Sequence, residues 1–211
     1  MPQPSADFSP FLLAALIVAA VPGPGIFYVA ARTLSEGRRA GVASTFGTAL
    51  GGLVHVIAGG LGISALILAS AQAFSVLKFA GALYLIWLGI RAFRKAGDLP
   101  AETTKPAGSA RAFREGIVVE ATNPKTAAFF LAFIPQFLDT TAVHPALQFM
   151  MLGLISVTLN TLADLVVVAA ASATRKNFVK RPRLFRRLRQ GSGLFMMGLG
   201  VSLVLARRPA N

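Results

Sequence analysis

The sequence predicts an all-α integral membrane protein with six transmembrane helices, arranged as two inverted three-helix repeats in which helices 1 and 4 are interrupted. Three observations carry this prediction. Hydrophobic residues make up 55% of the chain and charged residues only 14%, which leaves too little polar surface for a water-soluble domain. Long uncharged stretches alternate with short runs of Lys and Arg, as in the loops between membrane spans. Finally, both halves contain a proline-rich break in an apolar stretch.

The first repeat covers about residues 8–94. No charged residue lies between Phe11 and Ala31, and about 20 residues at about 1.5 Å each are enough to cross a hydrocarbon core of about 30 Å. This stretch is the first predicted helix. The second follows from residue 40 to a tight turn near 70–75. The third covers about 74–93.

A loop rich in Pro, Gly and charge follows at about 95–112, and we expect it to lie in the cytoplasm. The second repeat covers about 113–206. Its helices are predicted at about 115–138, 145–174 and 191–206. The whole chain is therefore expected to form a single transmembrane domain.

The distribution of bases predicts the orientation. Seventeen of the 21 Lys and Arg flank one side of the predicted helices and three flank the other. The positive-inside rule places the basic side in the cytoplasm and both termini outside, for a multi-pass protein of the bacterial inner (plasma) membrane. Basic residues also bind nucleic acid, but such domains carry them on a water-soluble fold, so we expect no nucleic-acid partner. The basic run from Arg175 to Arg189 is expected to lie on the membrane surface, held by anionic lipid headgroups.

The break in the first helix is a candidate substrate site. Pro22 and Pro24 each remove an amide donor, and Gly23 and Gly25 free the backbone between them. Unwound backbone at membrane depth is tolerated where it lines a cavity. A half-helix that starts near Gly25 would direct its positive dipole end at a substrate carboxylate. The alternative is a structural kink.

A second break at Asn123 and Pro124 adds a cation, Lys125, to an apolar helix. An unpaired charge there costs about 2.5–3.5 kcal/mol on insertion scales, so it needs a partner or a task. Lys125 either receives a substrate carboxylate, or pairs with Glu120 or Asp164 as a structural bridge.

Ionisable groups in other helices are candidates for proton coupling. Asp164 follows Asn160 and Ser156 at steps of four residues, which predicts a polar stripe that faces the bundle interior. Asp164 would there bind a proton or a substrate ammonium group, unless it is fixed by a nearby lysine or by hydrogen bonds. Glu120 is a second candidate. His55 lies on a face of small residues, where a proton relay competes with an ordinary interhelical hydrogen bond.

Catalytic chemistry is not indicated. The chain contains no Cys and only two His, so neither a disulfide nor a thiolate or His-rich metal site can form. No nucleophile with a base and no phosphate-binding motif is present. We therefore expect no catalytic residue, no metal and no cofactor.

Five short segments carry a family resemblance: Pro-Gly-Pro-Gly at 22–25, Gly-Arg-Arg-Ala-Gly at 37–41, Gly-Ala-Leu-Tyr-Leu-Ile-Trp-Leu-Gly at 81–89, Asn-Pro-Lys at 123–125 and Phe-Ile-Pro-Gln-Phe at 133–137. Together they resemble the LysE family of lysine, threonine and homoserine-type efflux proteins, also called RhtB. The resemblance implies a six-helix inner-membrane exporter of amino acids, often a homodimer, that exchanges its substrate for protons. It also matches the family's helix-5 aspartate to Asp164.

These features predict a secondary transporter that exports amino acids or closely related small metabolites, with two broken helices that meet beside buried ionisable groups. Its partners would be a small amino-acid-like substrate, protons and membrane lipids. Two alternatives stay open at this point. One is a membrane-embedded enzyme or lipid-handling protein, and the other is a passive channel.

Overall fold

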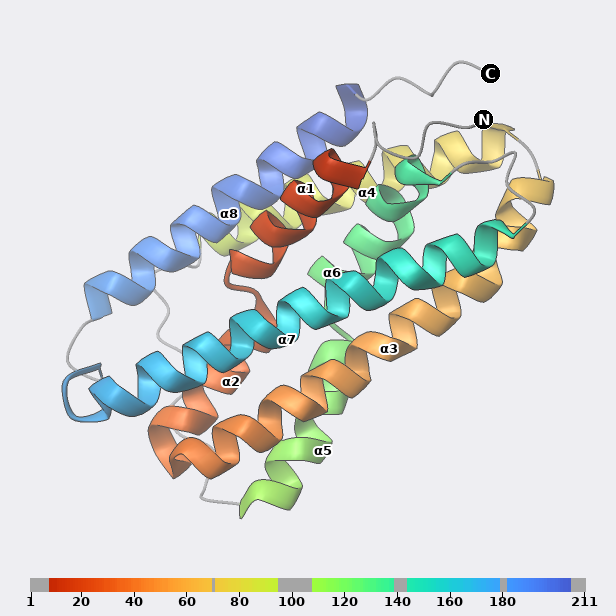
Figure 1. The fold of residues 1–211 in the computed structure, drawn as a ribbon. Coiled ribbons are helices and arrows are strands. Elements are labelled where there is room, and N and C mark those ends of the chain that lie inside the picture. The colour runs from red at the N-terminus through yellow and green to blue at the C-terminus, as the bar shows by residue number, and fades with distance from the viewer. Residues whose placement is uncertain (1–7, 70, 95–107, 139–143, 179–181, 206–211) are drawn as a thin grey trace.

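Helices alone form the regular structure of the part of the chain that the computed structural model describes, which is residues 8–69, 71–94, 108–138, 144–178 and 182–205 (Figure 1). The predicted all-α class is confirmed. The α-helices are α1 (Phe8–Ala20), α2 (Pro24–Glu36), α3 (Arg38–Ala69), α4 (Ala71–Arg94), α5 (Gly108–Ala121), α6 (Pro124–Ala128), α7 (Pro145–Phe178) and α8 (Pro182–Leu205).

Both predicted interruptions are present. The first helix is broken between α1 and α2, which are bent by 43°. The fourth is broken between α5 and α6 at Thr122 and Asn123. In each case a proline opens the second piece, where its missing N–H leaves no hydrogen bond unmade and its fixed φ suits the first helical turn.

A third irregularity follows α6, where a π-helical turn at Phe129–Phe133 passes into a 3₁₀ turn at Ile134–Phe137. Pro135 lies in this stretch and has no amide to donate to the preceding turn, so the hydrogen-bond register shifts. The side-chain amide of Gln136 donates to the Ala132 carbonyl at 2.7 Å and satisfies an acceptor there.

Several predicted boundaries were wrong. The turn near 70–75 is shorter than predicted, because α4 already begins at Ala71. The loop at 95–112 is also too long, since α5 begins at Gly108. Most of the basic run belongs to helix ends, because α7 continues to Phe178 and α8 begins at Pro182 instead of Gly191. Lys and Arg are good helix formers, so a helix continues where its hydrophobicity ends. Residues 179–181 of the basic run lie outside the described residues.

Membrane spans are indicated by length and composition. Among the described residues, three helical stretches are long and apolar enough to cross a membrane: Arg38–Gly62, Gly108–Phe137 and Pro145–Ala173. The bent pair of α1 and α2 gives a fourth. The chain is thus a multi-pass membrane protein, while the six-span inverted repeat stays a prediction.

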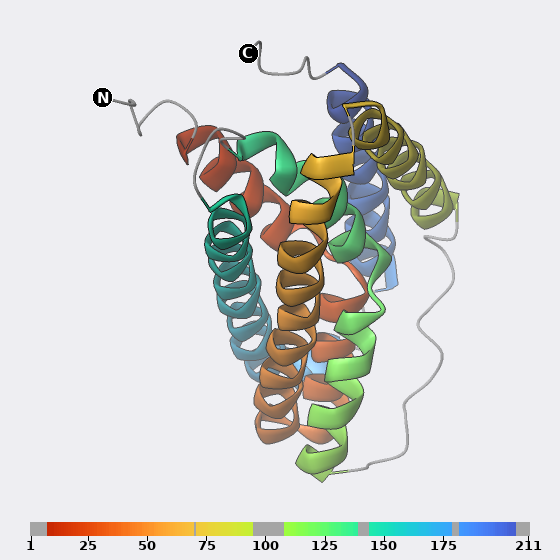
Figure 2. The same ribbon diagram turned by 90° about the vertical axis from the view of Figure 1, so that its right-hand side faces the viewer.

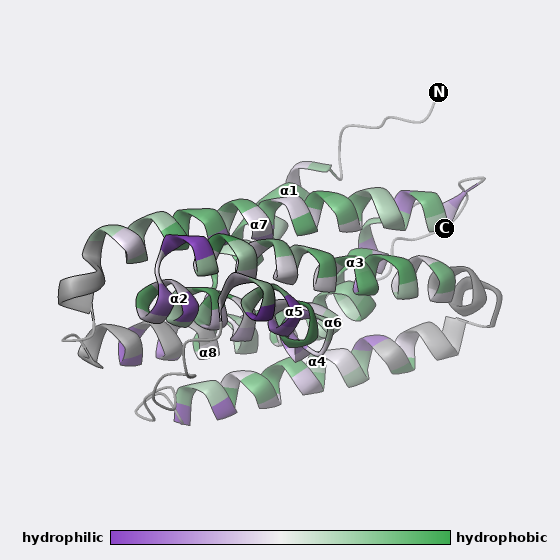
Figure 3. Cartoon of the chain, turned by 90° about the horizontal axis from the view of Figure 1, so that it is seen from below, coloured by the Kyte–Doolittle hydropathy of each residue, from purple (hydrophilic) through white to green (hydrophobic). Residues whose placement is uncertain are grey.

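Packing places the broken helices at the centre of the bundle. α3 packs against α5 and α7, α2 contacts α3, α5 and α7, and α4 and α8 form a pair beside them (Figures 1 and 2). Gly37, with φ of 94°, allows the sharp reversal from α2 to α3. Large apolar side chains on the outer faces are exposed, among them Leu83 and Val166, as expected for surfaces in contact with lipid (Figure 3).

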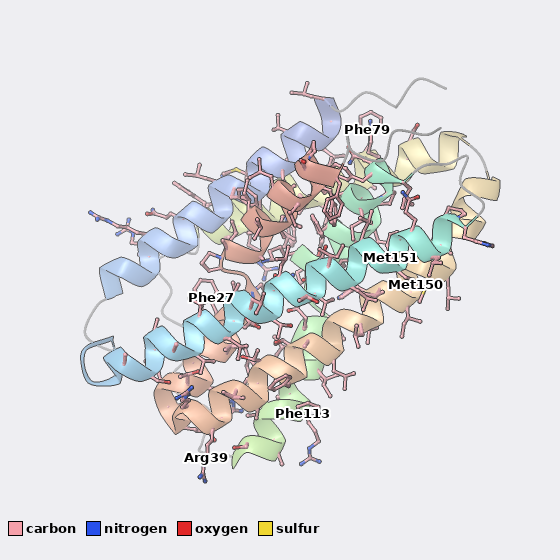
Figure 4. All side chains as sticks on the ribbon, viewed as in Figure 1. Phe27, Arg39, Phe79, Phe113, Met150 and Met151 are labelled. Atoms are coloured by element: carbon pink, nitrogen blue, oxygen red, sulfur yellow. The ribbon has the colours of Figure 1, made fainter. Side chains whose placement is uncertain are left out.

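The bundle has two different ends. The end of α2 and the starts of α3 and α5 share one end, which we call the basic end because Arg38, Arg39, Arg111 and Arg114 are exposed there (Figures 1 and 4). The start of α1 and the end of α8 lie at the opposite end (Figure 2). Near it, a cluster of phenylalanines packs between α1, α7 and the irregular turns after α6; we call it the aromatic cluster, and it comprises Phe11, Phe129, Phe130, Phe133, Phe137 and Phe149.

The close approach of α3 and α5 depends on glycine. A Cβ on Gly47 would lie 2.1 Å from the Phe113 carbonyl oxygen, so we expect Gly47→Ala to lower the free energy of unfolding by about 1–3 kcal/mol, as overpacking does. Gly62, also on α3, has nothing within 4 Å of an added Cβ and gives the matched control. Thermal unfolding in detergent measures the difference; equal midpoints for Gly47→Ala and Gly62→Ala would contradict it.

Candidate functional site

A narrow pocket lies where the two helix breaks meet α3 and α7. Its cavity has a volume of about 20 Å³, measured as the space open to the centre of a water molecule. A molecule as large as an amino acid therefore enters only when side chains move apart. Both apolar and ionisable side chains line it: Gly25, Ile26, Thr48, Ala49, Gly52, Glu120, Asn123, Lys125, Thr126, Phe130, Val157, Asn160, Thr161 and Asp164.

The pocket gathers residues that the sequence singled out from separate helices. The candidates that line it are Gly25, Glu120, Asn123, Lys125, Asn160 and Asp164. The candidates that do not line it are Pro22, Gly23, Pro24, Pro124 and His55. Those on the second list lie in the two breaks, except for His55 on α3.

Lys125 joins the two breaks. Its Nζ donates to the carbonyl oxygens of Val18 at 3.0 Å and Val21 at 2.9 Å, which lie where α1 ends. The break frees these carbonyls from the helical ladder, and they form the negative end of the α1 dipole. Gly23 makes room, since a Cβ there would lie 3.1 Å from Cδ and Cε of Lys125.

The structural bridge offered as an alternative for Lys125 is absent from the ion pairs of the described residues. Neither Glu120 nor Asp164 comes within ion-pair distance of the Lys125 ammonium group there. Sequence reasoning considered a substrate carboxylate or the side chains of Glu120 and Asp164 as partners of the buried cation, but no backbone group. Freed backbone carbonyls take that place and leave both carboxylates without an ionic partner among the described residues.

Glu120 organises the second break. Its Oε2 accepts a hydrogen bond from Nδ2 of Asn123 at 2.9 Å, and its Oε1 accepts one from the Thr126 hydroxyl at 2.6 Å. Asn123 in turn caps α6 by accepting from the Lys125 amide at 3.0 Å. Gly25 brings the first break against this group, because a Cβ there would lie 2.5 Å from Oε2 of Glu120. Both carboxylate oxygens are therefore engaged.

Asp164 has a different environment. Its side chain is buried, with 5% of the residue exposed, and Oδ2 accepts from the Thr48 hydroxyl at 2.9 Å. No hydrogen bond from the described residues reaches Oδ1, and the residue lines the pocket. Asn160, one turn before it, donates from Nδ2 to the Ser156 carbonyl at 3.1 Å, which leaves its amide oxygen as an acceptor beside the pocket. Asp164 thus offers a negative group to the pocket.

His55 makes an interhelical hydrogen bond. Its Nε2 lies 2.9 Å from the Glu120 carbonyl oxygen, and Nε2 must carry the hydrogen because a carbonyl only accepts. The imidazole ring packs 5.7 Å from the ring of Phe130. This is the bond that the sequence offered as the alternative to a proton relay.

One polar cluster was missed. Base counting grouped Arg32 with the charges that flank the predicted helices, but its side chain is buried and forms ion pairs with Glu36 and Glu115. Tyr28 completes the cluster, which joins α2 to α5. The spacing of four residues from Tyr28 to Arg32 and from Arg32 to Glu36 places all three on one helix face, and this was the available signal.

Metal ligands do not gather in the described part of the chain, where no three His, Asp or Glu side chains meet closely enough to hold an ion. What the pocket offers is a lysine ammonium group, a carboxylate with one open oxygen, an amide oxygen and hydroxyls. These groups suit a small molecule that carries both a cationic and an anionic or polar end.

Comparison with known proteins points to one family. The family model described as LysE type translocator matches residues 16–207. An uncharacterized membrane protein of Vibrio cholerae is 33% identical over 93% of this chain and 96% of its own length. A homoserine/homoserine lactone efflux protein of Salmonella typhimurium is 32% identical over 93% and 95%, and a leucine efflux protein of Salmonella choleraesuis is 28% identical over 68% of each chain. No solved structure matches.

Proposed function

We propose, since this chain belongs to the LysE type translocator family, that it is a secondary transporter that exports amino acids or closely related small metabolites across the bacterial inner membrane in exchange for protons. Members of the family are translocators, so the chain is a transporter and not an enzyme. One observation carries the proposed mechanism: both helix breaks, a buried lysine and a carboxylate with an open oxygen meet at one pocket.

The α-amino group is the shared feature of the substrates named for the relatives. Homoserine, homoserine lactone and leucine all carry it, whereas the lactone has no free carboxylate. Recognition of an ammonium group is therefore the contact that this substrate class requires. Asp164 is suited to it, because Asp164 and Asn160 both line the pocket and Oδ1 of Asp164 receives no hydrogen bond from the described residues, while both oxygens of Glu120 are already bonded.

We assign the other end of the substrate, its carboxylate or carbonyl oxygen, to a binding site at the two helix breaks. α2 begins at Pro24 with its free amides near Gly25, and Lys125 supplies the positive charge. In the described conformation Lys125 is bonded to the α1 carbonyls, so a substrate carboxylate or carbonyl oxygen competes with those carbonyls for the ammonium group. Substrate binding would then loosen the link between the two breaks.

Proton exchange is assigned to the same carboxylate. A carboxylate at a membrane-embedded pocket can bind a proton or a substrate ammonium group, but not both. If Asp164 releases one when it binds the other, export of the amino acid is coupled to proton entry. Glu120 and His55 hold the second break in place in this scheme.

The inverted repeat is supported by the pattern of helix contacts. If the two halves of the chain are exchanged, α3 corresponds to α7, and the broken pair of α1 and α2 corresponds to the broken pair of α5 and α6. The packing of α3 against α5 then corresponds to that of α7 against α1, and the pairs α3 with α7 and α4 with α8 correspond to themselves. This pattern fits two halves that enclose a site between their broken helices.

Orientation follows from the basic end. With Arg38, Arg39, Arg111 and Arg114 in the cytoplasm, both termini lie outside, and the exposed Arg186 and Arg187 of α8 would contact anionic headgroups. The homodimer stays a prediction from the family resemblance.

Counterflow in proteoliposomes tests the transport function. We expect liposomes preloaded with unlabelled homoserine or leucine to take up the labelled amino acid transiently above equilibrium, and an imposed pH gradient to drive net movement. A passive channel or an enzyme shows no such overshoot. Empty liposomes and liposomes with the heat-inactivated protein are the controls, and a linear, non-saturating flux would contradict a carrier.

A further inference from the structure

We propose that a polar cluster between α2 and α5, formed by the buried Arg32 with Tyr28, Glu36 and Glu115, is the gate that closes the pocket towards the basic end of the bundle. We call it the charge cluster. The inference rests on the proposed transport function for its biological meaning, but its geometry and its test need no substrate.

The position of the charge cluster follows from the two helices that it shares with the pocket. On α2, Gly25 and Ile26 line the pocket, and Arg32 lies about 10 Å further along the axis from Gly25, towards the basic end. On α5, Glu120 lines the pocket, and Glu115 lies about 7 Å nearer the basic end. The cluster therefore lies between the pocket and the water at that end.

Its contacts tie α2 to α5. Arg32 is fully buried and pairs with Glu36 of its own helix and with Glu115 of α5. The Tyr28 hydroxyl accepts from Nε of Arg32 at 3.2 Å and donates to the Ala112 carbonyl at 2.9 Å. Glu36 also accepts from the backbone amide of Gly108, the first residue of α5, at 2.9 Å.

The opposite side of the pocket is closed independently. α1 and α6 are the other halves of the broken helices, and they are joined by Lys125 and by the aromatic cluster, in which the rings of Phe11 and Phe137 lie 5.5 Å apart. In each broken helix, one half belongs to the charge cluster and the other half to the opposite closure. The halves at the charge cluster are α2 and α5, and those at the opposite closure are α1 and α6. The breaks thus allow the charge cluster to open while the aromatic cluster stays packed.

The chemistry of the two closures differs in a way that suits a gate. The side chains of Arg32 and Glu36 are buried and that of Glu115 is 32% exposed, so these ion pairs add little net stability compared with apolar packing, because the charges lose much of their hydration. When α2 and α5 separate, Arg32, Glu36 and Glu115 regain that hydration from the water at the basic end. Hydration therefore offsets the loss of the ion pairs when the charge cluster opens, whereas separation of the aromatic cluster exposes apolar surface to water.

Thiol accessibility tests the gate, and the chain is suited to it because it contains no native cysteine. A single Ala49→Cys places a reporter in the pocket wall, and a separate Arg39→Cys, reconstituted in the same way, measures what fraction of the vesicles presents the exposed basic end to the medium. In those vesicles we expect Glu115→Gln to raise the reaction rate of the Ala49→Cys thiol with a membrane-impermeant maleimide by about tenfold, equal to about 1.4 kcal/mol in the opening equilibrium. From the other side the rate should stay unchanged.

Two further variants keep the outcome decisive. Tyr28→Phe retains every charge and removes only the hydroxyl that bridges the helices, so it carries the test if Glu115→Gln does not fold, with a smaller rise expected. Arg114→Gln removes one charge, of the opposite sign, from the exposed face of α5 and should leave the rate unchanged. Unchanged rates in both cluster variants, or equal rises from both sides, would overturn the gate. Failure of amino-acid counterflow would instead overturn the transport function.

Discussion

Asp164→Asn is expected to reduce proton-driven export by about 100-fold, which corresponds to about 2.7 kcal/mol of lost coupling or binding. Asparagine has nearly the same shape and still accepts the hydrogen bond from Thr48, so the packing of α3 against α7 should be kept. What it loses is the negative charge and the ability to bind and release a proton. Export driven by a pH gradient in proteoliposomes measures the effect.

Counterflow separates the two roles proposed for Asp164. If the carboxylate only carries the proton, exchange of labelled for unlabelled amino acid continues in Asp164→Asn, because exchange moves no net proton. If it also binds the substrate ammonium group, counterflow is lost as well. Thr158→Val on the same helix is the matched control, because its side chain is exposed and its hydroxyl bonds only within α7. Full pH-driven export in Asp164→Asn would place the coupling elsewhere.

The helix breaks could be predicted from the sequence because their cause is local. A proline lacks an amide wherever it stands, so Pro22, Pro24 and Pro124 interrupt an apolar helix whatever surrounds them. The polar stripe that contains Asp164 was equally visible, since helical periodicity alone places Asn160 and Asp164 on one face. Local signals thus identified most of the ionisable pocket wall.

The partners of these groups could not be predicted in the same way. Lys125 is held by the carbonyls of Val18 and Val21, and a backbone acceptor has no sequence signature. Arg32 was counted among the flanking charges because base counting treats an arginine after an apolar stretch in that way, although the structure buries it between two helices. Tertiary contacts decided both cases.

The ends of the last two helices were misjudged for a related reason. A prediction based on hydropathy ends a helix where the apolar residues end, but the backbone hydrogen bonds of the helix continue through a basic segment. α8 therefore begins at Pro182, before its apolar part. Proline at the first helical position was the signal for this start.

Lys125→Met is expected to abolish export and to lower the free energy of unfolding by about 1–3 kcal/mol, because buried carbonyl acceptors lose their donor. The ammonium group bonds to the carbonyls of Val18 and Val21, belongs to a residue of the pocket wall and is the positive group that we propose for substrate binding. Methionine fills a similar volume, so the packing against Gly23 is kept and the loss is attributable to the charge and its hydrogen bonds. Initial export rates and unfolding midpoints in detergent measure the two effects.

Lys125→Arg tests whether export depends on the hydrogen bonds by which Lys125 joins the two helix breaks or on its positive charge alone. This variant keeps the positive charge. Gly23 packs closely against the Lys125 ammonium group, since a Cβ added at Gly23 would lie 3.3 Å from Nζ, so we expect the broader guanidinium group not to fit. Export should therefore fall although the net charge is unchanged. Lys78→Met on α4, whose ammonium group lies 5.0 Å from the Phe79 ring, removes an equal charge away from the pocket and should leave export intact. Wild-type export in Lys125→Met would show that neither the substrate nor the contact between the two breaks depends on this cation.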